Sequence, residues 1–432
     1  MKKEIKVLWA LMAAMFFSYL PWYSFSAVSS FMVADFGLTM NQMGAILAVF
    51  QAGYVIMVIG VGFLADRFGH WPILTAATFC TALAAILTPF FTDGFYSLLA
   101  FRLATGLGAG AIYVPGLAYL SDWFDSAGRG KAFGAYTAAM TASYAGGYFV
   151  AAPLAASFGW RAGLVATSVP ALAAGLILLS LVPRLGPGQP QAETGPASPD
   201  PTSAHKFPKD APILLTTGYM GHMWELYAFW GWIGPFLVAS FIFHGYDPIK
   251  AAASGGLWSS LIILSGAVSV WLVGWLSDRL GRLRTIVLAA TLSLSAEFGL
   301  GFTYGGSLAL ILAVGFFIGF WSIADSGIYK ASLTESVPVS FKSTALGLQS
   351  ACGYLATIVS PLVFSLVLTS SNPGLTNSAE ATVWSWAFIT LGAGALLAPV
   401  SILYLSRRQA RRRHMSAAIL PDQSQPISES SS

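Results

Sequence analysis

The segment Gly62-Phe-Leu-Ala-Asp-Arg-Phe-Gly69 recurs 212 positions later as Gly274-Trp-Leu-Ser-Asp-Arg-Leu-Gly281. Each copy stands at the end of a long apolar run. Self-similarity at a fixed distance indicates that the chain contains two copies of one structural unit. In membrane proteins, such duplication can place a site between two halves that move against each other, so the repeat bears on function as well as on fold.

The composition places both copies in a membrane. Of the 432 residues, 56% are hydrophobic and 9% are charged, and one soluble core cannot bury so much apolar surface. A helix needs about 20 apolar residues to cross a bilayer, and no alternating pattern of a barrel is present. We therefore predict an all-α membrane protein with twelve transmembrane helices in two pseudo-symmetric six-helix bundles. The predicted spans are 7–33, 42–65, 72–91, 95–120, 132–156, 162–183, 212–241, 250–276, 284–303, 306–329, 341–369 and 382–405.

The spans divide the chain into two bundles, a linker and a tail. Residues 1–183 form the N-terminal bundle and residues 211–405 the C-terminal bundle. Residues 184–210 are rich in Pro, Gly, Ser and Thr, which predicts a disordered cytoplasmic linker between the bundles. Residues 406–432 begin with a cluster of Arg and end in a polar run, which predicts a basic, disordered cytoplasmic tail.

The distribution of Lys and Arg predicts the orientation. With the N-terminus inside, all of the 22 Lys and Arg except Arg102, Arg161 and Lys250 lie at cytoplasmic segments. Both termini are therefore expected in the cytoplasm, in a bacterial inner membrane. The net charge of +4 reflects this topology, and we expect no nucleic-acid partner. The first apolar run resembles a secretory signal, but its removal would leave eleven spans, so we interpret it as the first helix.

Further motifs recur at matching points of the two halves. The fourth span begins Arg102-Leu-Ala-Thr-Gly106-Leu-Gly108-Ala-Gly110, and Gly128-Arg-Gly-Lys-Ala-Phe-Gly134 has a related counterpart at Ser340-Phe-Lys-Ser-Thr-Ala-Leu-Gly347. Together with the twelve spans, the central linker and the two repeated loops, these motifs resemble the major facilitator superfamily. The resemblance covers nearly the whole chain. It implies a secondary transporter that works by alternating access, with a cavity lined by spans one, four, seven and ten.

The repeated loop has a physical interpretation of its own. Its glycines permit a tight turn and close helix approach, its Asp can accept hydrogen bonds from a helix N-terminus, and its Arg can bind carbonyls or acidic groups. The resemblance implies a clasp that stabilises the outward-facing state and breaks when the cytoplasmic side opens. The alternative is a short polar turn with the usual positive charge. The gating residues are Gly62, Asp66, Arg67, Gly69, Gly274, Asp278, Arg279 and Gly281.

Ionisable residues inside the spans are costly to insert and therefore indicate function. His222 and Glu225 lie three residues apart on one face of the seventh span, near the bilayer centre. Such a pair could bind a proton, and the alternative is a hydrogen bond that only fastens the span to a neighbour. Asp325 and Lys330, near the cytoplasmic end of the tenth span, are interpreted as an inner gate pair.

Arg102 lies about 10 Å below the predicted periplasmic edge, and no other cation lies so deep. It could hold a carboxylate or phosphate of the substrate with two hydrogen bonds. It could instead be a coupling residue, as the resemblance implies, or form a structural pair with Glu297 or Glu225. Glu297, in the ninth span, is a further candidate that could as well be structural.

Aromatic residues complete the candidate cavity. Their rings could stack on a flat or apolar substrate, although Trp and Tyr also favour membrane interfaces. We expect Pro21 and Pro235 to kink their helices. The aromatic candidates are Trp22, Tyr23, Tyr113, Trp224, Tyr227 and Trp230.

These residues favour a proton-linked transporter of a small organic anion, a carboxylate, over efflux of lipophilic or cationic compounds. A transporter-shaped sensor or scaffold is the alternative from another class, and a membrane enzyme is the least favoured. No P-loop and no nucleophile or metal-binding pattern is present. We therefore expect no cofactor, no metal and no catalytic residue. The expected partners are a small-molecule substrate, protons and the lipid bilayer, with a monomeric protein.

Overall fold

The computed structural model describes residues 3–124, 126–185, 208, 210–338, 341–374 and 377–419. Nearly all of the predicted linker, and the tail beyond residue 419, lie outside the described residues. Within these ranges the chain is helical, with short turns between helices and no strand. The last helix continues to Ile419, past residue 405 at which the sequence predicts the end of the twelfth span.

Eight helices belong to each half of the described chain. In the first half they are α1 (Lys3–Tyr19), α2 (Pro21–Phe36), α3 (Met40–Phe68), α4 (His70–Phe91), α5 (Phe95–Gly110), α6 (Tyr113–Ser121), α7 (Ser126–Phe158) and α8 (Trp160–Leu185). In the second half they are α9 (Ala211–Phe243), α10 (Pro248–Leu280), α11 (Arg282–Leu300), α12 (Leu308–Trp321), α13 (Ser326–Ser336), α14 (Lys342–Ser371), α15 (Ser385–Ala395) and α16 (Leu397–Ile419). Two 3₁₀ turns, η2 (Gly301–Thr303) and η4 (Ser378–Glu380), lie in the second half.

Four crossings of the membrane are each made of two helices separated by a break. When each such pair is taken as one crossing, the sixteen helices of the described chain make twelve crossings, and the prediction of twelve transmembrane helices is confirmed. The broken crossings are α1 with α2, α5 with α6, α12 with α13, and α15 with α16. Eleven crossings of the described chain are long and apolar enough to span a bilayer by themselves. The remaining helix, α7, has 33 residues but is rich in Ala, Gly, Ser, Thr and Tyr. It packs between α8 and α10, so it needs less apolar surface toward lipid.

The two prolines at which the sequence predicts kinks, Pro21 and Pro235, differ in whether their crossing is broken. Pro21 stands directly after the break between α1 and α2, as expected of a residue that cannot donate a backbone hydrogen bond. Pro235 lies inside α9, which runs without interruption from Ala211 to Phe243. The seventh crossing is therefore a continuous helix, and the first is broken.

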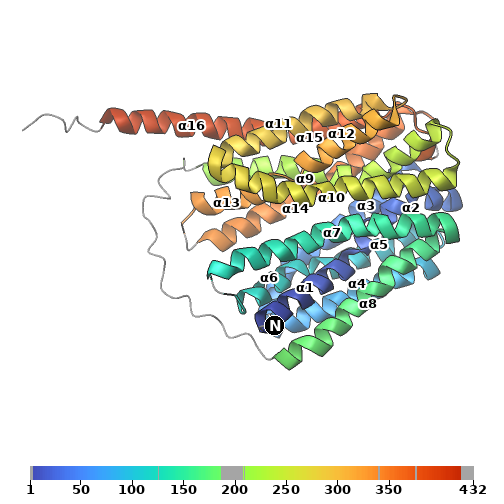
Figure 1. Ribbon diagram of the computed structural model, residues 1–432, viewed down its shortest axis with the longest axis horizontal. Helices are drawn as coiled ribbons and strands as arrows, with labels where there is room; N and C mark the ends of the chain where they lie inside the picture. Colours follow the sequence, from blue (N-terminus) through green and yellow to red (C-terminus); the bar gives the residue numbers. More distant parts are fainter. Residues whose placement is uncertain are drawn as a thin grey trace, which may run out of the picture.

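The two halves form two bundles that lie side by side, and their helices run roughly along the long axis of the molecule (Figure 1). They meet where α3 packs on α14 and α7 packs on α10. Small residues make these contacts close: a Cβ on Gly44 would lie 2.0 Å from Ser365 Oγ, and a Cβ on Gly256 would lie 2.0 Å from the Ala152 Cβ. Close approach of this kind is how helices associate in lipid, where the hydrophobic effect gives no preference between them.

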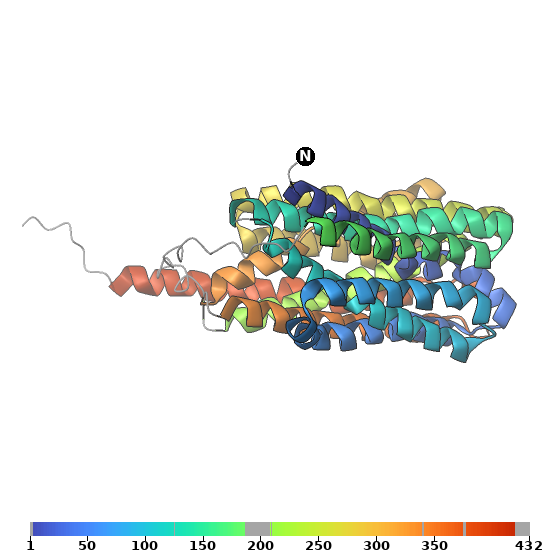
Figure 2. The ribbon, with the colours of Figure 1, turned by 90° about the horizontal axis from the view of Figure 1, so that it is seen from below.

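The two ends of the molecule differ. At one end, which we name the termini end, α1 begins and α16 projects beyond the other helices (Figures 1 and 2). Away from this end, α2 packs against both α9 and α10, so the halves are in contact there. At the termini end α6 and α13, both wholly described, make at most weak contact with each other. The bundles are therefore closed on the side opposite the termini.

Close packing of α3 on α5 predicts the effect of a larger residue at Gly106. A Cβ there would lie 2.1 Å from the carbonyl oxygen of Phe50, so Gly106→Val must push the two helices apart. We expect a loss of about 1–3 kcal/mol, seen as an earlier thermal transition in fluorescence-detected size-exclusion chromatography. Gly60→Val, where a Cβ meets no atom within 4 Å, is the control and leaves the transition unchanged. Equal behaviour of the two variants would contradict this packing.

Candidate functional site

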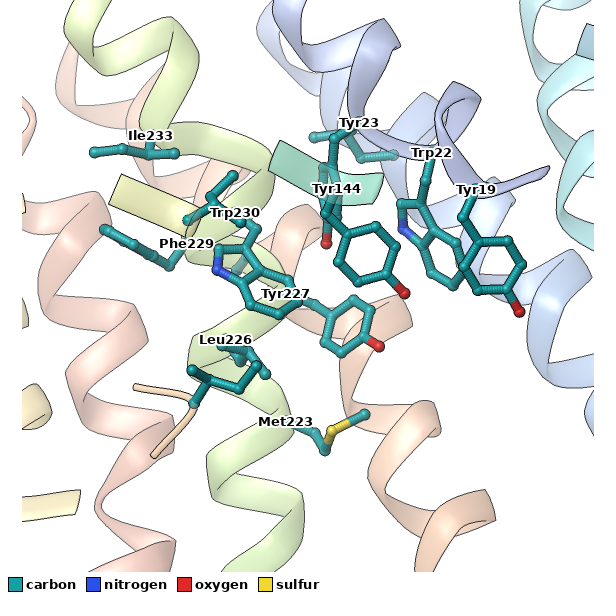
Figure 3. Close-up of a cluster of buried hydrophobic side chains, with 14 of the residues drawn as sticks. Tyr19, Trp22, Tyr23, Tyr144, Met223, Leu226, Tyr227, Phe229, Trp230 and Ile233 are labelled. Carbon is teal, nitrogen blue, oxygen red and sulfur yellow. The ribbon is translucent and has the colours of Figure 1, made fainter. Parts of the chain in front are cut away.

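A cluster of aromatic side chains fills the contact between the two halves (Figure 3). Trp22 of α2 lies 4.8 Å from Tyr54 of α3 and 6.1 Å from Tyr227 of α9, measured between ring centroids. Tyr144 of α7 lies 5.3 Å from Trp230 of α9. We name this group the aromatic cluster; its members are Trp22, Tyr23, Tyr54, Tyr144, Tyr227, Trp230 and Tyr354. Its rings pack on one another across the contact between the two halves.

Four of the aromatic candidates thus lie between the halves, but Trp224 does not. Its indole nitrogen donates a hydrogen bond to the carbonyl oxygen of Thr390, 3.0 Å away in α15. A Cβ on Gly394 would lie 2.3 Å from the same nitrogen, so the indole packs closely inside the second half. The expectation that Trp224 lines a central cavity is wrong. Spacing along α9 could not reveal this, because helices of the same bundle surround that face.

Tyr113 lies at the start of α6 and faces the second half. Its hydroxyl is 2.9 Å from Thr137 Oγ1, and because the Thr137 hydroxyl donates to the carbonyl of Phe133, Tyr113 is the donor. The ammonium nitrogen of Lys330, on α13, lies 5.9 Å from the centroid of the Tyr113 ring. The two halves therefore approach each other here through a cation and an aromatic ring.

Asp325 and Lys330 do not form the expected inner gate pair. Asp325 closes the break between α12 and α13, and its Oδ1 lies 2.9 Å from His222 Nδ1 of α9. Both side chains are buried, at 2% and 1% exposure, although neither ring nitrogen of His222 has a well-aligned hydrogen bond among the described residues. Asp325 thus belongs with His222, and Lys330 faces Tyr113.

Glu225 and His222 share α9, but the structure gives each a different partner, so the expected direct pair is not formed. Glu225 Oε1 accepts a hydrogen bond of 3.0 Å from the hydroxyl of Ser293, on α11. Glu297, also of α11, is an electrostatic neighbour of Glu225. Their exposures are 3% and 0%. We name Glu225 and Glu297 the carboxyl pair.

The carboxyl pair has little to balance a negative charge. Among the described residues, no Lys, Arg or His nitrogen lies within 4.0 Å of either carboxylate. Neither oxygen of Glu297 accepts a hydrogen bond from an N–H or O–H donor of the described chain. A carboxyl group in such surroundings forms a hydrogen bond with a second carboxyl only when one of them carries a proton.

Arg102 is held by the backbone of the first half, while its Nε is buried without a hydrogen-bond partner among the described residues. Its two terminal nitrogens donate hydrogen bonds to the carbonyl oxygens of Pro21 (3.2 Å) and Trp22 (3.1 Å). Its guanidinium lies 4.2 Å from the centroid of the Phe50 ring. The proposed structural pair with Glu297 or Glu225 is therefore wrong. Arg102 fastens α5 to the first turn of α2, directly after the break in the first crossing.

The two repeated loops share the same backbone geometry. Gly69 and Gly281 adopt φ angles of +86° and +90°, which confirms the tight turn expected of each. Gly62 and Gly274, however, face open space: no described atom lies within 4 Å of a Cβ there, so the close approach expected at these two positions is not made.

Only the second loop is fastened. The guanidinium of Arg282 lies 2.8 Å from Asp278 Oδ1 and 3.2 Å from Glu335 Oε1 of α13. Asp66 and Arg67, in the first loop, are exposed, and Asp66 has no hydrogen bond or ion pair with the described residues. Arg279, the expected counterpart of Arg67, lies over the ring of Trp275 instead. The sequence analysis did not select Arg282 or Glu335, because only their proximity in space reveals them.

Comparison with known proteins agrees with this architecture. The family model described as Major Facilitator Superfamily matches residues 11–322 and 250–424. A protein of Cupriavidus necator named as a probable sulfoacetate transporter is 25% identical over 400 residues, with 85% of this chain and 89% of that protein covered. A gallate transporter of Pseudomonas putida is 25% identical over 374 residues, which cover 78% of this chain and 80% of that protein.

Among solved structures, the fold is similar to that of a bacterial homologue of the human lysosomal transporter Spinster in an inward-facing, unoccupied conformation. The TM-score is 0.78 at 17% sequence identity, with 95% of this chain and 98% of the other covered. The family model and this likeness of fold agree with the two six-helix bundles. The chain belongs to the Major Facilitator Superfamily and is an integral membrane protein that transports a small molecule as a secondary transporter, and it is not an enzyme.

Proposed function

We propose that this transporter moves a small organic anion, with a carboxylate as the recognised group, together with protons. The observation that carries the proposal is the carboxyl pair, Glu225 and Glu297, which is buried among the helices of the second half with no cation beside it. The names of the relatives from Cupriavidus necator and Pseudomonas putida, for sulfoacetate and gallate, support an organic acid as the substrate.

The carboxyl pair favours proton binding for an electrostatic reason. Two neighbouring like charges repel strongly where the dielectric constant is low, and desolvation adds to the cost of charging either group. One proton held between the two carboxyls removes most of this cost. The Ser293 hydroxyl supplies a single hydrogen bond to Glu225, which is too little to stabilise two charges.

A second buried contact lies beside the carboxyl pair. Asp325 and Tyr329 are electrostatic neighbours of Glu225. The contact between His222 Nδ1 and Asp325 Oδ1, 2.9 Å long, lies one turn along α9. The carboxyl pair therefore has further polar groups of the second half around it.

The proposed setting is a bacterial inner membrane with both termini in the cytoplasm, as the distribution of Lys and Arg predicts. The termini end is then the cytoplasmic end, and the contact of α2 with α9 and α10 closes the periplasmic side. The state described here is on this proposal inward-facing. The unpaired Asp66 fits such a state, because the first clasp is expected to form only when the cytoplasmic side closes. We propose that the protein acts as a monomer.

Efflux of lipophilic cations receives less support. That function requires aromatic surface available to the substrate, whereas the rings of the aromatic cluster pack on one another and are nearly fully buried.

Removal of one carboxyl tests proton coupling. In proteoliposomes with an external pH-sensitive dye, a gradient of sulfoacetate, gallate or benzoate should draw protons inward with the wild-type protein and make the medium more alkaline. The amide introduced by Glu225→Gln neither binds nor releases a proton, so we expect net proton movement to fall at least about tenfold, while exchange of labelled carboxylate across the membrane continues. Glu380→Gln, at an exposed loop position, is the control. Undiminished proton movement in Glu225→Gln would contradict the role of the carboxyl pair.

A separate experiment tests the first clasp. Since the Asp66 carboxylate has no partner in this state, Asp66→Asn should leave the thermal transition of the purified protein unchanged. Transport should nevertheless slow several-fold, because the state with a closed cytoplasmic side loses its clasp. Glu4→Gln, an exposed substitution near the same end, is the control for both measurements. Wild-type transport by Asp66→Asn would show that the loop is only a polar turn.

A further inference from the structure

Lys330 is a cation inside a membrane-spanning crossing that lacks an anionic partner. Its side chain is half-buried on α13, in a crossing that runs from Leu308 to Ser336. Among the described residues, no carboxylate oxygen lies within 4.0 Å of its ammonium nitrogen. The two acids nearest along the chain, Asp325 and Glu335, are paired with His222 and Arg282. A charge in such a place is costly and is retained when it has a partner or a ligand.

The three cations that depart from the predicted cytoplasmic pattern each contact an acceptor of the chain, and the exposed Lys250 pairs with Asp247. Arg102 donates to two carbonyl oxygens, and Arg161 donates to the carbonyl of Pro89 and lies over the ring of Trp160. Arg102 therefore has a structural task. Lys330, unlike Arg102 and Arg161, has no hydrogen-bond acceptor among the described residues.

Tyrosines of both halves lie in the neighbourhood of the Lys330 ammonium. The ring of Tyr113, from α6, lies 5.9 Å away, and the phenol groups of Tyr219 (α9) and Tyr354 (α14) are its electrostatic neighbours. Tyr354 accepts a hydrogen bond from Tyr54, which leaves its own O–H free to donate. Tyr219 has no hydrogen-bond partner among the described residues.

These groups have the chemistry of an anion site. An ammonium group and two phenol hydroxyls supply donors of the kind that bind a carboxylate, and no carboxylate of the described residues lies within 4.0 Å of the ammonium nitrogen. The Tyr113 ring supplies a flat face against which a planar organic body can pack. Its hydroxyl is committed to Thr137, so Tyr113 contributes its ring rather than a donor.

We propose that Lys330, Tyr219, Tyr354 and the ring of Tyr113 form the binding site for the carboxylate of a small, planar organic acid. The site rests on the proposed function, since it names the place where the transported anion binds. Arg102, which the sequence favoured for this task, lies elsewhere and has other partners. The specificity of the site comes from charge at Lys330 and from shape at the aromatic rings.

The position of the site gives binding a mechanical consequence. Tyr113 belongs to α6 of the first half and Lys330 to α13 of the second, and these helices make at most weak contact in this state. An anion held by Lys330 against the Tyr113 ring draws α6 toward α13. Because both helices lie at the termini end, substrate binding favours closure of that end, which is the step that alternating access requires.

Direct binding tests the site without relying on transport. The probe is benzoate, with benzamide as its neutral counterpart, and the measurement is the stabilisation of purified protein against heat as each compound is added. Wild-type protein should be stabilised by benzoate and not by benzamide. Lys330→Met should lower the apparent affinity for benzoate at least about tenfold, with partial recovery in Lys330→Arg. Tyr219→Phe should weaken binding several-fold.

Controls keep these results separate from misfolding. Lys250→Met and Tyr96→Phe remove the same groups at exposed positions and should bind benzoate as the wild type does. Each variant must first show the thermal transition of the unliganded wild type, and Lys330→Arg serves where Lys330→Met does not fold. Benzoate affinity of Lys330→Met within about twofold of the wild type would overturn the site while leaving the proposed function intact. Failure of the wild type to bind or transport benzoate, sulfoacetate or gallate would overturn both.

Discussion

The cost of an unbalanced charge between lipid-embedded helices is the constraint on which this structure depends. Each ionisable group of the interior meets it differently. Arg102 is balanced by backbone carbonyls exposed where α1 gives way to α2, and His222 by Asp325 at the break between α12 and α13. Glu225 and Glu297 meet it by sharing a proton, on our proposal, and Lys330 by binding the substrate. Two of these groups are thus satisfied by the chain, and the others require something that the transporter carries.

The two groups that the chain balances, Arg102 and His222, lie at two of the four broken crossings, the one between α1 and α2 and the one between α12 and α13. A broken crossing exposes backbone groups and brings polar side chains into the bundle, and both breaks lie where the two halves meet or near it. The contacts between halves combine small residues, as at Gly44 with Ser365, and large rings, as in the aromatic cluster. Neither the small residues nor the rings join the halves through an extended hydrogen-bond network among the described residues. The halves can therefore move relative to each other while each bundle keeps its own packing.

Much of the fold could be predicted from the sequence, because membrane insertion depends on local properties. The length of the apolar runs predicts the twelve crossings. The repeated loops predict the duplication, and the glycines that end them adopt positive φ angles in the structure. Predicting the site was harder, since i to i+3 spacing on α9 selected His222 and Glu225 correctly as buried groups but not their partners. Partners such as Ser293 and Glu297 come from α11, and only the packing of separate helices brings them to α9. The same limitation explains the misplacement of Trp224 and the missed Glu335, whose contacts also come from distant parts of the chain.

The most direct test of the account is whether the carboxyl pair holds a proton at neutral pH. Infrared difference spectroscopy of the purified protein, wild type minus the double variant Glu225→Gln with Glu297→Gln, reports the carbonyl stretch of a neutral carboxylic acid. The account predicts a band for one neutral carboxyl group in the wild type at neutral pH, absent from the double variant. A spectrum showing only ionised carboxylates at these positions would contradict it, because two buried charges without a cation would then be stable in the membrane.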